Sequence, residues 1–350
     1  MDTPAPASSW QRGVLQCAVA AVLFGATTPL ASRLASETNA ATLAGLLYLG
    51  AALAVLPLSG RHTSPRAVWR QGGRRLATAV VAGGLLGPVL LTAGLARTSA
   101  ATASLLLNME LVTTVVLAAL FFGEHIGRRV ATGTAVVVFA GLALTWNESP
   151  EPRLGAVLIV AACICWGLDN CVTASLDQIA PHHITLAKGV IAGSTNLVIG
   201  LAAASQLPLA GLIGSSLMLG AIGYGASITL WVRGARDLGA ARGQLIFSTA
   251  PFIGALVAWT VLGDSPTWAQ AVALVLAASG VGLVVRSGHE HRHVHAPLEH
   301  EHEHEHDEHH AHHPAGDDAT FRRHTHRHVH EPLVHAHPHV PDLHHRHEHE

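Results

Sequence analysis

The chain has 350 residues, of which 49% are hydrophobic and only 13% are charged, with a formal net charge of −2 and a mean hydropathy of +0.36. A soluble domain carries roughly 25% charged residues, so this composition excludes an ordinary water-soluble fold and predicts a protein embedded in a lipid bilayer. The net charge by itself says nothing about nucleic acid, but the sequence has no basic stripe, so we expect no nucleic-acid partner.

Ten apolar segments follow one another along the chain, each long enough to cross a bilayer as a helix. The first, preceded by Arg12, has some features of a signal peptide, but the nine segments that follow favour an uncleaved span. We therefore expect an all-α membrane protein with ten transmembrane helices, over residues 14–34, 41–58, 77–95, 99–122, 129–146, 154–176, 184–203, 212–233, 240–262 and 267–285.

The two halves of the chain repeat one pattern of five spans. Phe24-Gly25 is matched by Trp166-Gly167, and Gly123-Glu124 is matched by Gly263-Asp264. Because each half has an odd number of spans, the second half must lie inverted relative to the first, as in many secondary transporters. The sequence therefore divides into an N-terminus (1–13), a first five-helix repeat (14–146), a second five-helix repeat (154–286) and a polar tail (289–350).

The distribution of arginine predicts the orientation in the membrane, because cytoplasmic loops carry an excess of basic residues. If the N-terminus is cytoplasmic, the opposite face receives only Arg33, Arg97 and Arg153. The cytoplasmic face then receives Arg61, Arg66, Arg70, Arg74, Arg75, Arg128, Arg129, Arg233, Arg236 and Arg242. We expect an integral plasma-membrane (inner-membrane) protein with both termini in the cytoplasm.

Three charged residues lie within the predicted spans, where a charge costs about 2.5–3.5 kcal/mol on insertion scales. Asp169 and Lys188 fall at similar depth on adjacent antiparallel spans, so they predict either a structural salt bridge or part of an inner gate. Glu110 lies midway along span four with no obvious partner and is expected to be protonated much of the time. It is a candidate proton carrier or ligand for a cationic group, or else a neutral acid bonded to a backbone carbonyl.

Other residues within the spans are weaker candidates for a transport cavity, because amides and aromatic rings also serve helix packing. Pro29 and Pro251 predict kinks in spans one and nine. The remaining cavity candidates are Asn108, Asn170, Asn196, Gln244, Trp166 and Tyr224.

The phrase from Ala101 through Leu107-Asn108-Met109-Glu110 to Phe122-Gly123-Glu124, with the repeated halves, resembles the EamA-type permeases of the drug/metabolite transporter superfamily. Gly263-Asp264 takes the corresponding exit position in the second half, whereas Pro251 stands where the first half has Leu111, so the halves have diverged. The resemblance implies a ten-span bundle with a central cavity and transport of a small solute, without specifying the solute. Glu124 and Asp264 are expected to anchor helix ends.

The polar tail holds 23 of the 27 histidines of the chain. Its few large apolar residues predict disorder in the absence of metal. The segment His291–Leu298 recurs 35 residues later as His326–Leu333. In an extended chain, His-x-His presents two imidazoles on one side, and imidazole suits Zn, Ni, Co and Cu. The predicted ligands are His291, His293, His295, His300, His302, His304, His306, His326, His328 and His330. A solvated, pH-responsive segment is the other reading.

Together these features predict a permease that moves a small metabolite by alternating access in the export direction, either linked to protons or facilitative. It has a metal-binding tail and no required cofactor. One alternative is a transition-metal transporter loaded by the tail, although the spans are poor in metal ligands. A second is a membrane protein that senses or stores metal without transport. No nucleotide loop or nucleophile motif supports an enzyme.

Overall fold

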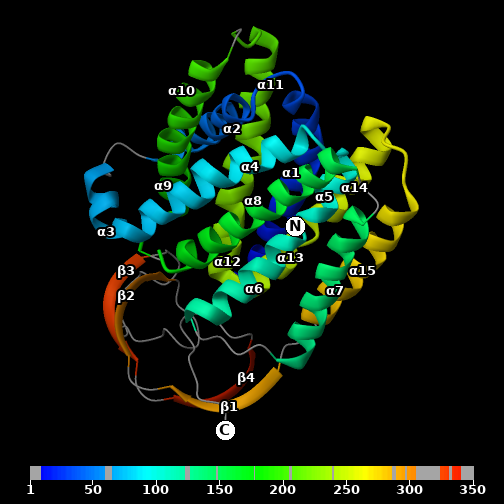
Figure 1. Ribbon diagram of the computed structural model, residues 1–350. Helices are drawn as coiled ribbons and strands as arrows, with labels where there is room; N and C mark the ends of the chain where they lie inside the picture. The colour runs from blue at the N-terminus through cyan, green and yellow to red at the C-terminus, as the bar shows by residue number, and fades with distance from the viewer. Residues whose placement is uncertain are drawn as a thin grey trace, which may run out of the picture.

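The computed structural model describes residues 9–59, 65–122, 127–146, 149–176, 178–204, 207–238 and 240–285, and four short segments of the tail. In these ranges the structure forms a bundle of helices (Figure 1). Nine helical stretches are long and apolar enough to cross a membrane, and a shorter apolar one covers Trp268–Leu283. All ten predicted spans therefore correspond to helices. Their bounds are shifted by a few residues, except in span three, which was predicted from residue 77 and begins with α3 at Pro65.

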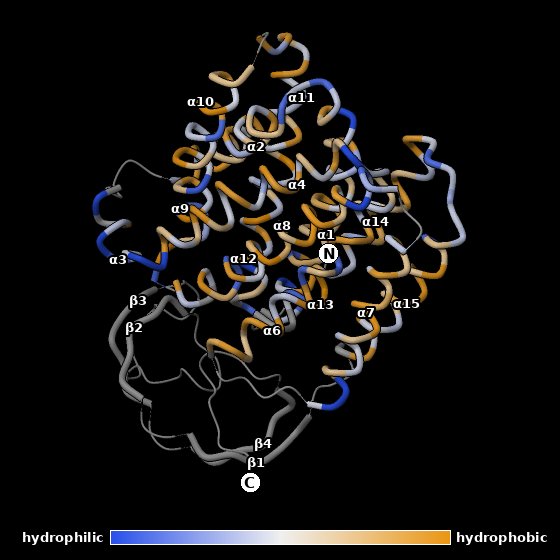
Figure 2. The backbone as a smooth tube through the Cα atoms, viewed as in Figure 1, coloured by the Kyte–Doolittle hydropathy of each residue, from blue (hydrophilic) through white to orange (hydrophobic). Residues whose placement is uncertain are grey.

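Five spans contain one main α-helix: α1 (Ser9–Ala35), α2 (Ala40–Val55), α7 (Arg128–Thr145), α8 (Pro150–Ala174) and α15 (Trp268–Val285). A 3₁₀ turn, η1 (Leu56–Ser59), extends α2. Most residues along these helices are apolar, and polar residues gather at helix ends and loops (Figure 2).

Three spans are interrupted by π-helical segments, in which the backbone makes i→i+5 hydrogen bonds. Span three comprises α3 (Pro65–Thr78), η2 (Ala79–Leu86) and α4 (Gly87–Leu95), and span seven comprises α9 (Pro181–Ala187), η3 (Lys188–Ala192) and α10 (Gly193–Ala203). Span eight comprises α11 (Ala210–Gly220), η4 (Ala221–Ala226) and α12 (Ser227–Leu238).

Spans four and nine are broken by non-helical residues near their middle. Span four consists of α5 (Ala100–Leu106) and α6 (Met109–Phe122), whereas span nine consists of α13 (Ala240–Phe247), α14 (Ala250–Val257) and the π-helical η5 (Ala258–Leu262). The two breaks fall at corresponding places in the two halves of the chain.

The helices of the two halves pack reciprocally. Helix α1 of the first half packs on α12 and α14, and α8 of the second half packs on α4 and α6. Helix α2 packs on α10, and α7 packs on α15. This exchange of partners agrees with two related five-helix units, and the inverted relationship between them stays a prediction.

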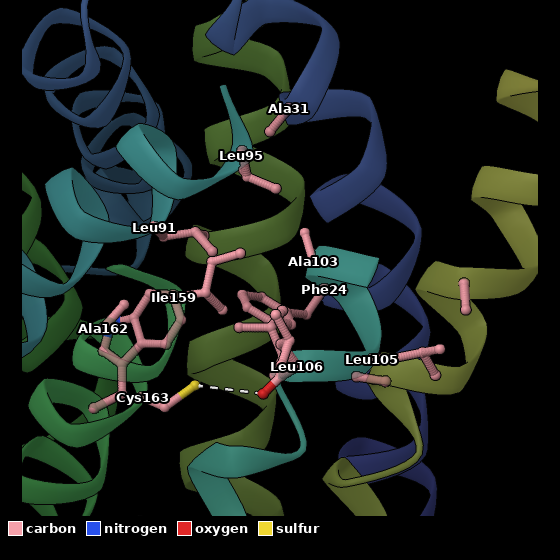
Figure 3. Close-up of a cluster of buried hydrophobic side chains, with 14 of the residues drawn as sticks. Phe24, Ala31, Leu91, Leu95, Ala103, Leu105, Leu106, Ile159, Ala162 and Cys163 are labelled. Carbon is pink, nitrogen blue, oxygen red and sulfur yellow. Dashed lines mark hydrogen bonds between the residues drawn. The ribbon is translucent and has the colours of Figure 1, made fainter. Parts of the chain in front are cut away.

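The core of the bundle is made of small and aliphatic side chains. Ala103, Leu106, Ile159 and Cys163 are buried there, and Phe24 lies among them (Figure 3). Small residues let helix backbones approach closely where lipid supplies no hydrophobic drive. A Cβ on Gly220, for example, would meet the backbone of Leu47, so glycine is required at that crossing.

Four strands lie within the tail: β1 (His289–His295), β2 (Leu298–His304), β3 (His324–His330) and β4 (Leu333–His339). β1 pairs antiparallel with β4, and β2 pairs antiparallel with β3. The predicted disorder is therefore not confirmed for these four segments, which pair as two antiparallel ladders between residues 289–304 and 324–339. The rest of the tail lies outside the described residues.

Candidate functional site

The break in span four has a local cause at Asn108. Its side-chain Nδ2 donates to the carbonyl of Leu105 at 2.9 Å, so the amide competes with the backbone for a helical acceptor. The carbonyl of Leu106, the last residue of α5, instead accepts a long hydrogen bond from the thiol of Cys163 on α8 at 3.9 Å (Figure 3). Helix α8 therefore supports the break from the other half of the chain.

The break in span nine has a different cause, Pro251. Proline lacks a backbone N–H, and its ring clashes with the carbonyl four residues earlier in a continuous helix. The hydroxyl of Ser248 donates to the carbonyl of Leu245 at 2.6 Å, and that of Thr249 donates to Ile246 at 2.8 Å. These hydroxyls satisfy carbonyls at the end of α13, so the interruption costs few unpaired backbone groups.

Glu110 lies in the first turn of α6, directly after the break, and is 9% exposed. Its Oε1 accepts hydrogen bonds from Nδ2 of Asn170 at 2.8 Å and from Nε2 of Gln244 at 3.5 Å. Both partners are neutral amides, and they come from spans six and nine. Within the described chain, Oε2 of Glu110 accepts no hydrogen bond and stays available for a proton or a ligand.

A small hollow lies between the two breaks, with room for no more than about one water molecule. Span four supplies Asn108 and Glu110 to its wall, and span nine supplies Gln244, Ser248 and Pro251. Such discontinuous helices, one from each half, are where secondary transporters place substrate. The conformation described here is closed, so any larger ligand requires the hollow to open.

Two polar atoms of the residues that line this hollow have no hydrogen-bond partner in the described structure: Oδ1 of Asn108 and Oε1 of Gln244. The hydroxyl of Tyr224, whose ring contacts Phe24, also has none. Buried polar groups are nearly always hydrogen-bonded, because an unsatisfied one costs about 1–3 kcal/mol. The free oxygens of Asn108 and Gln244 are therefore acceptors that a ligand or water in the hollow can satisfy.

Aromatic rings line the same region. Phe24 and Phe247 form part of the wall of the hollow, with ring centroids 5.5 Å apart. Phe24 also contacts Trp166 and Tyr224 edge-on, at 6.1 and 5.7 Å. Tyr48 lies 5.4 Å from Tyr224, so both tyrosines of the chain belong to this cluster.

Asp169, the residue before Asn170 on α8, forms a buried ion pair with Lys188 of η3. Nζ of Lys188 donates to both carboxylate oxygens of Asp169 at 2.6 Å. The side chain of Lys188 is 4% exposed and that of Asp169 is 11% exposed. The hydroxyl of Thr173 donates to the same carboxylate at 2.9 Å. The salt bridge expected from the sequence is therefore present, and its role in gating stays a prediction.

The ion pair packs against the π-helical segment η2. A Cβ on Gly83 would overlap the carboxylate of Asp169, so glycine is needed at this contact. The carbonyl of Gly83 accepts hydrogen bonds from the hydroxyl of Tyr48 at 2.5 Å and the indole of Trp166 at 3.1 Å. Asn196 donates to Leu85 of the same segment at 3.1 Å. The irregular backbone of η2 is thus held by side chains from three other spans.

The structure brings Glu110, Asn170 and Gln244 into direct contact, with Asn108 and Tyr224 nearby. Asp169 pairs with Lys188. The side chains of Trp166 and Asn196 donate hydrogen bonds to backbone carbonyls of η2 and not to a carboxylate. Four residues were missed by sequence reasoning: Phe24, Tyr48, Gly83 and Phe247. The two tyrosines are the only ones in the chain, which could have directed attention to Tyr48, but nothing local distinguishes Gly83 or Phe247.

No group of three or more His, Cys, Asp or Glu side chains lies close enough to hold a metal ion in the parts of the chain whose side chains the structure describes. The predicted tail ligands lie in β1, β2 and β3, of whose side chains nothing is described, and His306 lies outside the described residues.

Asp264 anchors a helix end, as expected. Its Oδ2 accepts a hydrogen bond from the backbone N–H of Ala101 at 3.1 Å, in the first turn of α5. Gly263 before it adopts φ 80°, a left-handed conformation that glycine tolerates and that ends η5. The corresponding prediction for Glu124 lies outside the described residues.

Comparisons with known proteins agree with this architecture. The profile of the EamA-like transporter family matches residues 11–146 and 153–286. An uncharacterized transporter from Methanothermobacter thermautotrophicus is 24% identical over 213 residues, and the match covers 58% of this chain and 62% of that relative. A crystal structure described only as that of a protein matches with a TM-score of 0.57 at 17% identity, covering 81% of this chain and 99% of that chain, which is a likeness of fold alone.

Proposed function

Because the chain belongs to the EamA-like transporter family, we propose that it is a permease that moves a small metabolite by alternating access, with its substrate site at the two helix breaks. The members of this family are membrane transporters and not enzymes. Substrate, direction and coupling ion are parts of the proposal, as are the plasma membrane and the cytoplasmic location of both termini.

One observation carries this proposal: spans four and nine are both broken, and their breaks line a single closed hollow with unpartnered polar atoms. Non-helical backbone at membrane depth is tolerated where it is buried in protein or lines a cavity. Two such interruptions at corresponding places of the two halves favour a binding site whose access changes when one half moves against the other.

Glu110 is the proposed coupling group, with Asn108, Asn170 and Gln244 around it. A proton on Oε2 neutralises the only buried charge at the hollow, so loading and release of substrate can be linked to proton binding from opposite sides. Export then follows where the proton gradient is directed inward. Asp169 and Lys188 are the proposed inner latch, which breaks and re-forms during the cycle, and η2 is the irregular segment that moves with it.

A transition-metal transporter is the first alternative, and a metal sensor or store without transport is the second. Against the first, Glu110 is the only residue with a carboxylate, imidazole or thiol that lines the hollow. A site for Zn, Ni or Co takes three or four such ligands. A metal passing this hollow would therefore leave most of its coordination sphere to water.

Metal binding by the tail is a separate part of the proposal, and the register of its strands supports it. His291 lies opposite His337, and His293 lies opposite His335. In β2 and β3, His300 pairs with His328 and His302 with His326. Directly opposed residues share one face of an antiparallel ladder, so each ladder brings histidines from the segments 289–304 and 324–339 to one face.

Alternating access can be tested without knowing the substrate. Ser248 is buried beside the hollow, so in a chain without its native cysteines a Ser248→Cys variant should react with a membrane-impermeant maleimide only when the hollow opens. We expect labelling in proteoliposomes from the inside and, separately, from the outside. Labelling from one side alone would contradict alternating access and favour a protein that does not transport.

A further inference from the structure

We propose that the substrate is a monovalent organic cation with an apolar body, held by Glu110 and the aromatic rings beside it. This inference rests on the proposed function, because it names the substrate class of the same hollow. It follows from the charge balance of the site, the hydrogen bonds of Glu110 and the chemistry of the surrounding wall.

The charge balance favours a single positive charge. Among the buried charged side chains of the described spans, Lys188 is already bonded to both oxygens of Asp169, so that pair is neutral overall. Glu110 has only amides as partners. When ionised, it leaves the hollow with one uncompensated negative charge, which one proton or one monovalent cation neutralises.

The geometry at Glu110 leaves one oxygen for the ligand. Asn170 and Gln244 both donate to Oε1, which fixes the carboxylate plane, while Oε2 accepts no hydrogen bond within the described residues. The free oxygens of Asn108 and Gln244 add two more acceptors at the same hollow. A site with free acceptors and a carboxylate is suited to an N–H donor with positive charge.

The wall is suited to an apolar body rather than to a hydrated inorganic ion. Phe24 and Phe247 line the hollow, and Tyr224 packs edge-on against Phe24. The face of an aromatic ring attracts an organic cation, by about 2 kcal/mol or more where water is excluded. A divalent metal would instead require further carboxylate, imidazole or thiol ligands, and none of these lines the hollow besides Glu110.

A zwitterion fits less well, because the hollow offers little to a carboxylate. No lysine or arginine lines it. A helix amino end can bind a carboxylate through free N–H groups, and the one at the hollow without an acidic residue is that of α14. There Pro251 has no N–H, and the N–H of Phe252 is bonded to the carbonyl of Thr249 at 3.1 Å. We therefore expect the site to select an ammonium over the amino acid of the same size.

The test compares three probes of one shape: phenethylammonium, which is a monocation at pH 7.5, the zwitterion phenylalanine and the neutral 2-phenylethanol. Binding to the purified full chain is measured by equilibrium dialysis, and uptake is measured in proteoliposomes. We expect only phenethylammonium to bind and be transported, with uptake falling as the pH of the substrate side is lowered, because protons compete for Oε2 of Glu110.

Glu110→Gln should weaken phenethylammonium binding roughly 30-fold or more, the scale on which unpairing a buried charge weakens a complex. Glu110→Asp should retain part of the binding and the pH dependence, which separates the charge from a folding defect. Glu37→Gln serves as the matched control, because Glu37 is exposed at the end of α1.

Equal binding of phenylalanine or 2-phenylethanol, or unchanged phenethylammonium binding in Glu110→Gln, would overturn the inference. If no probe binds while Ser248→Cys is still labelled from both sides, the substrate class is wrong and the proposed function stands. If Ser248→Cys is labelled from one side only, the proposed function itself fails.

Discussion

The ammonium of Lys188 lies 2.6 Å from both carboxylate oxygens of Asp169. Asp169 belongs to α8 in span six, and Lys188 begins η3 in span seven. Both side chains are nearly buried, so each charge depends on the other for its solvation. Asn170, the next residue on α8, donates instead to Glu110. One turn of α8 therefore connects a neutral ion pair to a carboxylate without a cationic partner.

Removing one member of this ion pair should destabilise the protein more than removing both. Lys188→Met leaves the Asp169 carboxylate buried without a counter-charge, and we expect a loss of about 3–5 kcal/mol. Lys188→Met combined with Asp169→Asn should recover most of that loss. Thermal unfolding of the detergent-purified variants measures it, and a double variant as unstable as Lys188→Met alone would show that the pair is not the source of the effect.

Gly83→Ala should destabilise the contact between η2 and α8, because the added Cβ overlaps the carboxylate of Asp169. Overpacking of this kind costs about 1–3 kcal/mol and should also slow labelling of Ser248→Cys. Gly211→Ala is the matched control, since a Cβ at Gly211 meets no atom within 4 Å. Equal melting temperatures for the two variants would contradict the expectation.

Pro251→Ala should restore a backbone donor at the break in span nine and raise the stability of the bundle, by about 1 kcal/mol or more. If the break is required for movement, labelling of Ser248→Cys should at the same time become severalfold slower. Pro181→Ala is the control, because Pro181 also lies in the first turn of its helix, α9, but follows a connecting segment instead of the end of another helix in the same span. Unchanged labelling in Pro251→Ala would mean that the break is structural only.

Cys163→Ala should cost about 1–3 kcal/mol, because the carbonyl of Leu106 loses the only donor that the break provides for it. Cys163→Ser retains a donor of similar size and should be close to the native stability. The neighbouring half-buried Cys165 donates to no residue in the described structure, so Cys165→Ala should have little effect. The free energy of unfolding of the three variants is compared by denaturation in mild detergent. Equal losses for Cys163→Ala and Cys163→Ser would mean that the hydrogen bond to Leu106 does not contribute to stability.

Deletion of the chain after Gly288 should remove most zinc binding, measured by titration of ZnCl₂ against a competing chelator. A sharper variant combines V334H, H335V, A336H and H337A, which keeps the composition of β4. It moves two of the three histidines of β4, with their His-x-His spacing kept, out of register with His291 and His293. We expect this variant to weaken binding in the β1–β4 ladder about as much as His291→Gln with His293→Gln.

An unchanged zinc affinity in that rearranged variant would mean that each strand binds metal by itself. A compensating slip by one residue is disfavoured, because the two ladders, 289–295 with 333–339 and 298–304 with 324–330, share the same register. A slip would move each of these pairs by one position.

The sequence by itself determined the number and nature of the spans, because about 20 consecutive apolar residues in lipid leave the backbone few options besides a helix. It also determined which charges lie inside the membrane, and the pairing of Asp169 with Lys188 followed from equal depth on adjacent spans. Pro251 was visible as a kink, since proline acts on its own helix. Asn108 was predicted only as a cavity residue, and the break that it makes in span four was not foreseen.

Only the tertiary structure decided that the two interruptions line one hollow, that Asn170 and Gln244 donate to the same oxygen of Glu110, and that Phe24 and Phe247 form its wall. These contacts join residues 60 to 223 positions apart, and no local propensity encodes them. They depend on how closely the helices approach. Glycines such as Gly83 set that approach, and their importance is visible only once the opposing side chain is in place.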